Sequence, residues 1–240
     1  MSALSYIEEA QKLINQISIT QYDKIIETSK LFVDKIKNKK IIHIFGTGHS
    51  HMISEELFDR AGGLANINAM LDDTVTIASG ATKGSKLERL SGLAEILWDH
   101  YDIEPDDLMI IISNSGRNSV PVQMALKARE EGLKLIVITS LNHAKSCQSR
   151  DSSGKKLYEL GDIVLDNCVP SGDSLLDFNG KKSGPGSTIA GITILNSIVA
   201  EALKTLTEEG FDLPILGSQN VDGTDNDDLY KKYKARIKHL

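Results

Sequence analysis

The chain has 240 residues, of which 40% are hydrophobic and 25% are charged, a balance typical of a globular protein that can bury a core. Its net charge of −6, with no basic stripe to offset it, argues against nucleic acid as the main partner. No apolar run is long enough to span a bilayer and the N-terminus lacks a signal-peptide pattern, so no membrane partner is expected.

Two amphipathic helices are predicted at the N-terminus. Apolar residues recur at helical spacing from Leu4 to Ile17. Thr20, followed three residues later by Asp23, has the pattern of a capping box that opens a second helix. We therefore expect residues 1–38 to form a helical pair on the domain or on a partner subunit, and residues 39–240 to form the main domain.

From residue 41 onward, short apolar runs alternate with helical patterns. This alternation predicts βαβ units, and hence a parallel sheet covered by helices. His43, in the middle of the first run, is expected to be a core histidine with its hydrogen bonds satisfied. Strands are predicted at 41–45, 65–71, 108–112, 133–138 and 163–165, helices at 51–60, 87–101, 120–131 and 188–206, and a strand or an irregular loop at 74–78.

Two of these strands end in loops rich in glycine and hydroxyl groups. We call Gly46-Thr47-Gly48-His49-Ser50 the first loop and Ser113-Asn114-Ser115-Gly116-Arg117-Asn118-Ser119 the serine loop; a third strand ends in Thr139-Ser140. Ligands of open parallel sheets bind beyond the carboxyl ends of the strands. Free backbone N–H groups at such loops bind anions, above all phosphate. No arginine–lysine cluster accompanies the serine loop in the sequence, so hydroxyl and backbone groups are expected to do most of the holding.

The sequence gives no indication of a cofactor or a metal. His51 stands where a dinucleotide-binding Gly-x-Gly-x-x-Gly pattern needs its last glycine, and no Walker lysine is present. His51 and Glu55 could share a metal on one helix face, but no third ligand is evident. The two cysteines, Cys147 and Cys168, lack metal-type spacing, which favours a reducing cytoplasm as the location.

Three residues are candidates for proton transfer. Glu56 shares a helix face with Met52 and Ile53, and an apolar setting suits a carboxylate that acts as a general base near neutrality. The alternative for Glu56 is a surface ion pair with Arg60 one helical turn later. His49 and His143 flank the presumed pocket, where either could donate a proton during ring opening or simply hydrogen-bond to the backbone.

These motifs together resemble the sugar isomerase (SIS) domain. The resemblance runs from about Lys40 to Leu206, and it is carried by the first loop, the serine loop, Glu55-Glu56-Leu57 and Val137-Ile138-Thr139-Ser140. The stretches at 55–63 and 152–160 resemble a little-characterised subfamily that carries the label of phosphoheptose isomerase. The resemblance implies a flavodoxin-like, three-layer α/β sandwich with a five-stranded parallel sheet, which binds a sugar phosphate and forms a homodimer or a dimer of dimers. It also implies a set of ligand-binding residues: Gly48, Ser50, Ser113, Asn114, Ser115, Asn118, Ser119 and Ser140.

The same resemblance implies an aldose–ketose isomerase in which Glu56 is the base, with a non-catalytic phosphosugar sensor as the alternative. Three departures from phosphoheptose isomerases leave the reaction open. The predicted helix at 188–206 lacks their glutamine and histidine, the segment before Glu56 is about one helical turn shorter, and Arg117 is inserted between Gly116 and Asn118. The long polar loops at 173–186 and 217–228 are expected to be functional or mobile.

Overall fold

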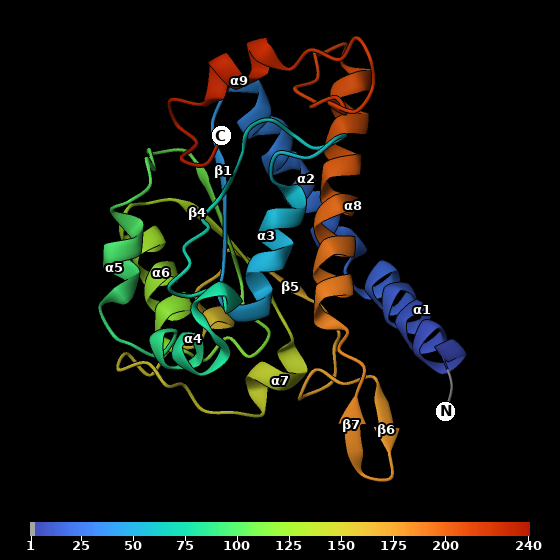
Figure 1. Ribbon diagram of the computed structural model, residues 1–240, viewed down its shortest axis with the longest axis vertical. Coiled ribbons are helices and arrows are strands. Elements are labelled where there is room, and N and C mark those ends of the chain that lie inside the picture. The colour runs from blue at the N-terminus through green and yellow to red at the C-terminus, as the bar shows by residue number, and fades with distance from the viewer. Residues whose placement is uncertain (1–2) are drawn as a thin grey trace.

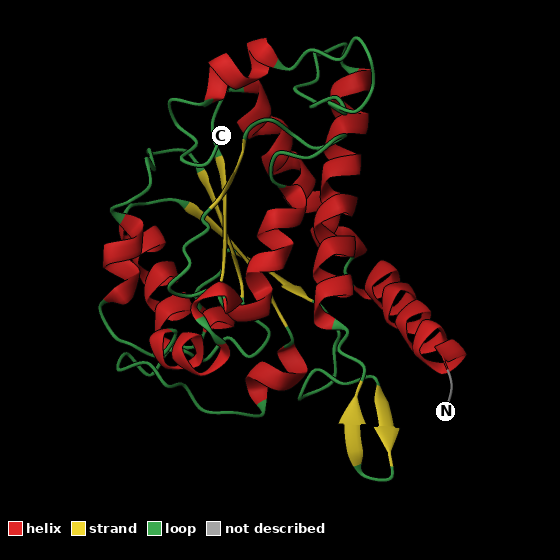
Figure 2. Ribbon diagram, viewed as in Figure 1, coloured by secondary structure: helices red, strands yellow, loops and turns green. Residues whose placement is uncertain are grey.

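Five parallel strands form the central sheet, in the order β2-β1-β3-β4-β5 (Figure 1). The computed structural model describes residues 3–240, without the side chain of Ser79. The predicted five-stranded α/β sandwich is confirmed, since helices cover both faces of this sheet (Figure 2). The strands are β1 Ile42–Gly46, β2 Ile67–Ala69, β3 Leu108–Ile112, β4 Lys134–Thr139 and β5 Ile163–Asp166.

The strands read as continuous apolar runs because both of their faces are buried. Alternate side chains of each strand point to opposite faces. Ile44, Ile110 and Ile136 lie in one core cluster with helices α2 (Tyr22–Lys37) and α8 (Ser187–Glu208). Their sequence neighbours lie in the other cluster, with α5 (Leu93–Trp98) and α6 (Ser119–Glu130). Each such buried side chain contributes about 1.5–3 kcal/mol relative to an exposed one.

The N-terminal helical pair belongs to the same core. Helix α1 spans Ala3–Thr20, and its Leu13 packs in the cluster around α8. The predicted capping box at Thr20 is wrong, because Thr20 is the last residue of α1 and its hydroxyl donates to the carbonyl of Gln16 at 2.8 Å. Gln21 separates the two helices and provides no side-chain cap.

The single helix predicted at 87–101 is also wrong. The chain forms two short helices, α4 (Ala81–Leu87) and α5, with Gly92 between them in the left-handed region at φ +86°. The amide of Gly92 donates to Oε1 of Gln123 at 2.8 Å, a tertiary contact that fixes the break. Of the two alternatives at 74–78 the irregular loop is the one observed, and it leads into a short 3₁₀ helix, Ile77–Ser79.

The remaining elements lie in the predicted loops or beside them. A 3₁₀ turn, Gly48–Ser50, precedes α3 (His51–Leu57), and α7 (Leu141–Lys145) follows β4. The polar segment 173–186 contains a hairpin, β6 (Leu176–Phe178) and β7 (Lys181–Ser183), which projects from the body of the fold (Figure 1). The 3₁₀ turn Leu157–Glu159 precedes β5, and α9 (Asp227–Tyr233) packs near the start of β1.

The expectation that no apolar run is long enough to span a bilayer is corrected at the long helix α8. Among the described residues it alone has the length and composition of a membrane span, and 44% of its most apolar 18-residue stretch is buried inside the fold. Its buried residues pack against α2 and the sheet. Length and composition are weak evidence for a span, because core helices satisfy the same test.

The buried histidine of β1 is satisfied, as predicted. Nδ1 of His43 lies 2.9 Å from Nδ2 of Asn68, and Nε2 lies 3.1 Å from Oδ2 of Asp107. An amide nitrogen must donate, so Nδ1 accepts from Asn68, and the protonated Nε2 donates a hydrogen bond to the carboxylate of Asp107. The imidazole therefore links three neighbouring segments at the opposite end of β1 from the first loop.

Candidate functional site

The first loop and the serine loop leave neighbouring strands at the centre of the sheet. Gly46, the last residue of β1, pairs with Ile112, the last residue of β3. The chain continues from β1 to one side of the sheet and from β3 to the other, so the two loops flank the topological switch point. We call this side of the sheet the carboxyl edge.

The first loop depends on two glycines for its shape. A Cβ atom on Gly46 would lie 2.6 Å from the backbone carbon and oxygen of Ser50, so only glycine lets the chain fold back there. Gly48 adopts φ +56° and its amide donates to the carbonyl of Val75 at 2.8 Å. Nδ1 of His51 hydrogen-bonds to the carbonyl of Gly48. These contacts fix the backbone and leave His49 exposed at the loop's tip.

The serine loop is tied back onto β4. Gly116 adopts φ +57°, where a Cβ atom would lie 3.2 Å from Cβ of Leu157. Its amide donates to Oγ of Ser113 at 3.2 Å. The carbonyl of Asn114 accepts from Oγ1 of Thr139 at 3.2 Å and from the amide of Ser140 at 3.1 Å. The loop is therefore preorganised before any ligand arrives.

The predicted ligand residues fall into two groups. The Ser140 hydroxyl is fully buried, donates to the carbonyl of Val169 at 2.6 Å and accepts from the amide of His143 at 3.0 Å. The Ser119 hydroxyl donates to a backbone carbonyl at 3.3 Å, and Asn118 accepts from a neighbouring arginine at 2.9 Å. These three side chains, like Ser113, already hold the framework together.

Ser50 and Ser115 are different. Both are half-buried, and within residues 3–240 neither hydroxyl has a hydrogen-bond partner. Ser115 lies just before the 12-residue helix α6, whose N-terminal amides carry a partial positive charge. An anion at this edge could accept hydrogen bonds from these hydroxyls and from backbone amides at once.

Three arginines lie near the serine loop, which corrects the expectation of a site without a cationic cluster. The amide of Arg150 donates to the carbonyl of Arg117 at 2.8 Å, and Nη1 of Arg150 donates to Oδ1 of Asn118 at 2.9 Å. Burial, and then the charges of Arg117 and Arg89, lower the pKa of Arg150. The three arginines are far apart in the sequence, so no local pattern could have revealed the cluster.

His143 lies on the other flank of Arg117. Its ring is half-buried, and Nδ1 is fully enclosed with no hydrogen-bond partner in the described part of the chain. Burial and the Arg117 charge lower the pKa of His143, while Asp173 opposes them. Asp173 caps α8, because its carboxylate accepts from the amides of Gly186 and Ser187 at 3.0 and 2.8 Å. Burial and the Arg117 charge both favour the neutral imidazole of His143, a residue that lies near the serine loop.

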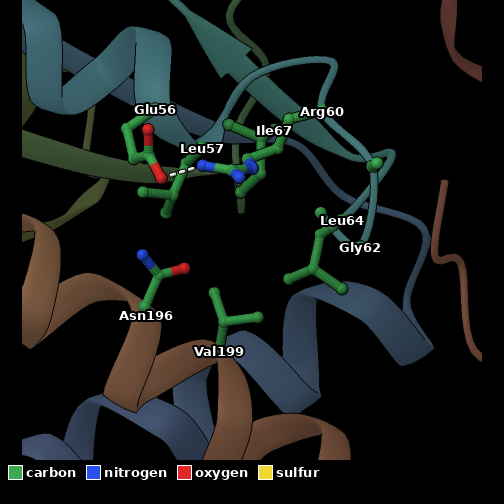
Figure 3. A pocket seen from close by; sticks show the side chains of 10 residues that line it. Glu56, Leu57, Arg60, Gly62, Leu64, Ile67, Asn196 and Val199 are labelled. Atoms are coloured by element: carbon green, nitrogen blue, oxygen red, sulfur yellow. Dashed lines mark hydrogen bonds and ion pairs between the residues drawn. The ribbon is translucent and has the colours of Figure 1, made fainter. Parts of the chain in front are cut away.

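Glu56 occupies a separate cavity of about 220 Å³ between α3 and α8. It lies five positions after His51 along the helix, a rise of about 7.5 Å away from the carboxyl edge. Its carboxylate pairs with Arg60, and Asn196 and Val199 face this pair across the cavity (Figure 3). The lining includes no serine-loop residue. The Glu56–Arg60 ion pair, which was the alternative considered from the sequence, therefore forms. Within a single chain, Glu56 and the serine loop do not line the same cavity.

Comparison with known proteins gives one family and several relatives. The model of the SIS domain matches residues 5–140. The UPF0309 protein TTE0306 of Caldanaerobacter subterraneus subsp. tengcongensis is 39% identical over 242 residues, covering 98% of each chain. The UPF0309 protein Lm4b_02611 of Listeria monocytogenes is 42% identical over 238 residues, covering 97% of this chain and 96% of its own.

Solved structures share the fold at low identity. A phosphoheptose isomerase from Neisseria gonorrhoeae aligns with a TM-score of 0.56 at 14% identity, over 85% of this chain and 96% of its own. One from Francisella tularensis gives 0.53 at 17% identity, over 85% and 100%. The NanR protein of Vibrio vulnificus, complexed with ManNAc-6P, gives 0.52 at 15% identity, over 85% and 63%. The fold thus occurs both in isomerases and in a protein that binds a sugar phosphate.

Proposed function

Because the chain belongs to the SIS domain family, we propose that it binds a sugar phosphate at the carboxyl edge of its sheet. The main support is that the hydroxyls of Ser50 and Ser115 have no hydrogen-bond partner within residues 3–240. They lie on two loops whose shape depends on glycine and that follow adjacent strands. Gly48 and Asn114 shape the backbone around them. A charge-assisted hydrogen bond contributes about 1.5–3 kcal/mol, so several donors are needed for the roughly 8 kcal/mol of micromolar binding.

The proposed reaction is aldose–ketose isomerisation. A base removes the proton from the carbon next to the carbonyl and returns it to the former carbonyl carbon, while an acid moves a proton between the two oxygens. Glu56 is the proposed base, and His143 or His49 the proposed acid. The lowered pKa of half-buried His143 favours a neutral imidazole, which could take a proton from one oxygen and deliver it to the other, whereas exposed His49 is freer to move.

A second candidate is a sensor that binds the sugar phosphate without converting it. One observation favours it: Glu56 is already paired with Arg60 in a cavity that no serine-loop residue lines. The sensor needs only the loops of the carboxyl edge. The two candidates therefore share one binding site and differ in the role of Glu56.

A thermal-shift screen with a panel of sugar phosphates tests the shared part. At one hundred times Kd a ligand stabilises the folded chain by about 2.7 kcal/mol, which raises Tm by several degrees. We expect a rise with at least one sugar phosphate and none with its unphosphorylated parent sugar. A panel without any shift, or equal shifts with the parent sugars, would count against phosphate recognition. A turnover assay on the hits then separates isomerase from sensor.

We also propose a homodimer or a dimer of dimers in a reducing cytoplasm. Helix α1 exposes large apolar side chains, with Leu4 66%, Ile7 50% and Ile19 80% exposed. Burying such a surface against a second copy would remove it from water.

Light scattering at micromolar concentration is expected to give a dimer or tetramer for the wild type and a smaller species for Ile7→Asp. Ile96→Asp, on the distant helix α5 and 59% exposed, is the control that keeps the wild-type mass. A monomeric wild type would contradict the proposal.

A further inference from the structure

The side chain of Arg117 makes no hydrogen bond or ion pair that would hold the fold of the described chain together. Its backbone carbonyl is used, as the acceptor for the amide of Arg150. Its side chain is half-buried, and Nε is fully enclosed without a hydrogen-bond partner in residues 3–240. A buried donor left unmatched costs about 1–3 kcal/mol, so the side chain is held there at a cost to stability.

The surroundings add positive charge rather than neutralise it. Within the described chain, no carboxylate lies within 4.0 Å of the guanidinium groups of Arg89, Arg117 or Arg150. The charge of Glu88 acts on Arg150 and opposes the lowering of its pKa, but the Glu88 carboxylate accepts its hydrogen bond from Oγ1 of Thr47, at 3.0 Å.

On the side toward α8, the nearby carboxylate is that of Asp173, which is hydrogen-bonded to other groups. Asp173 acts on His143, but its oxygens are occupied by three hydrogen bonds at the start of α8, with Ser187 Oγ at 2.6 Å as the shortest. His143 itself presents a second enclosed and unpartnered nitrogen. In a chain of net charge −6, the guanidinium groups at this edge therefore keep positive charge that no direct ion pair within the described residues neutralises.

We propose that Arg117 binds the phosphate of the ligand directly and makes the site selective for a doubly charged phosphomonoester over a singly charged ester. This rests on the proposed function and deepens it. The planar guanidinium donates two parallel hydrogen bonds to two oxygens of one phosphate, which a lysine in the same place could not reproduce. Arg117 and Arg150 have no carboxylate within 4.0 Å in the described chain, so a dianion would neutralise their positive charge more fully than a monoanion.

The test compares Arg117→Gln and Arg117→Lys with Arg129→Gln as the matched control. Arg129 lies on α6, and its Nη1 donates to the carbonyl of Leu160 at 2.8 Å, so its side chain does hold the fold. The probes are inorganic phosphate at pH 8, glucose 6-phosphate and glucose 6-sulfate, measured by calorimetry, with Tm recorded for each unliganded protein.

We expect Arg117→Gln to weaken phosphate binding at least tenfold while its unliganded Tm stays equal or rises. The phosphate affinity of Arg117→Lys should lie between those of the wild type and Arg117→Gln. The wild type should prefer the phosphate ester to the sulfate ester at least tenfold, and Arg117→Gln should lose most of that preference. Arg129→Gln should show the opposite pattern, a lower Tm and unchanged affinity.

Two results would overturn the inference while sparing the proposed function. One is wild-type affinity in Arg117→Gln; the other is a lower Tm for that variant with unchanged affinity, which is the signature of a structural residue. A wild type that binds none of the phosphate probes would overturn both together.

Discussion

Replacing Asp107 by alanine is expected to lower the free energy of unfolding by about 3–5 kcal/mol. The carboxylate is completely buried and has four donors. Oδ1 accepts from the amide of Ile41 at 2.9 Å. Oδ2 accepts from the amide of Glu104 at 2.8 Å, from Nε2 of His43 at 3.1 Å and from Nη2 of Arg236 at 2.7 Å. Alanine would leave these donors unmatched inside the protein, and it would remove the buried one of the three carboxylates that hold Arg236 of the C-terminal segment.

The matched control is Asp102→Ala. Asp102 pairs with Nε of the same Arg236 at 2.8 Å, but its side chain is 56% exposed. An exposed pair contributes about 0–1 kcal/mol, so this variant should unfold almost like the wild type in urea. Equal losses for the two variants, or a loss below about 1 kcal/mol for Asp107→Ala, would contradict the account of the network.

The same carboxylate predicts a pH dependence. Burial by itself raises the pKa of Asp107, but the hydrogen bonds from His43 and from the amides of Glu104 and Ile41 outweigh it and lower the pKa to about 2. The folded value lies below the unfolded value near 3.8, so the stabilisation is present above about pH 4 and is lost as the pH falls toward 2. It amounts to about 2 kcal/mol. Urea titrations between pH 6 and pH 2 should show this slope in the wild type and not in Asp107→Ala.

Replacing Glu56 by glutamine is expected to lower turnover of the sugar phosphate by about 100-fold or more if the chain is an isomerase, because a positioned general base contributes about 10²–10⁴. Glutamine keeps the size of the side chain and removes the proton acceptor. The thermal shift caused by the ligand should persist, since the proposed phosphate donors Ser50 and Ser115 do not line the Glu56 cavity.

Glu55→Gln is the control for that experiment. Glu55 is the preceding residue of α3, its side chain is 51% exposed, and it lies 3.5 Å from Nε2 of His51. We expect this variant to turn over the substrate like the wild type. Wild-type turnover in Glu56→Gln would remove Glu56 as the base, and ligand binding by a wild type that converts none of the panel would favour the sensor.

The sheet could be predicted from the sequence because its signal is local. Runs such as Leu108–Ile112 are apolar throughout, which happens when both faces of a strand are buried. The order of glycine and hydroxyl residues after β1 and β3 likewise marks loops at the carboxyl edge. Where tertiary contacts decide the local structure, the prediction failed: Gln123 holds Gly92 in a left-handed turn, and the helix predicted at 87–101 is broken there.

The site itself could be predicted only in part. The residues around a loop in the sequence do not reveal charged side chains that come from distant parts of the chain. Arg89 and Arg150, which lie near Arg117 in the fold, could therefore not be predicted. Nor does helical spacing reveal that Glu56 and Arg60 close their own cavity with α8, since Asn196 comes from a distant part of the chain. A hydroxyl in a motif, such as that of Ser140, can equally be a ligand or a cap, and here it caps α7.

The most direct test of phosphate binding at the carboxyl edge is to map the bound ligand on the wild-type chain by ¹⁵N NMR. The amides of Gly48, Ser115 and Gly116 are expected to shift most on titration with a sugar phosphate that raises Tm, because they lie on the two loops beside the proposed phosphate. Gly62 and Gly63, which line the Glu56 cavity, are the internal comparison. Larger shifts at Gly62 and Gly63, with the loop amides unmoved, would contradict the account.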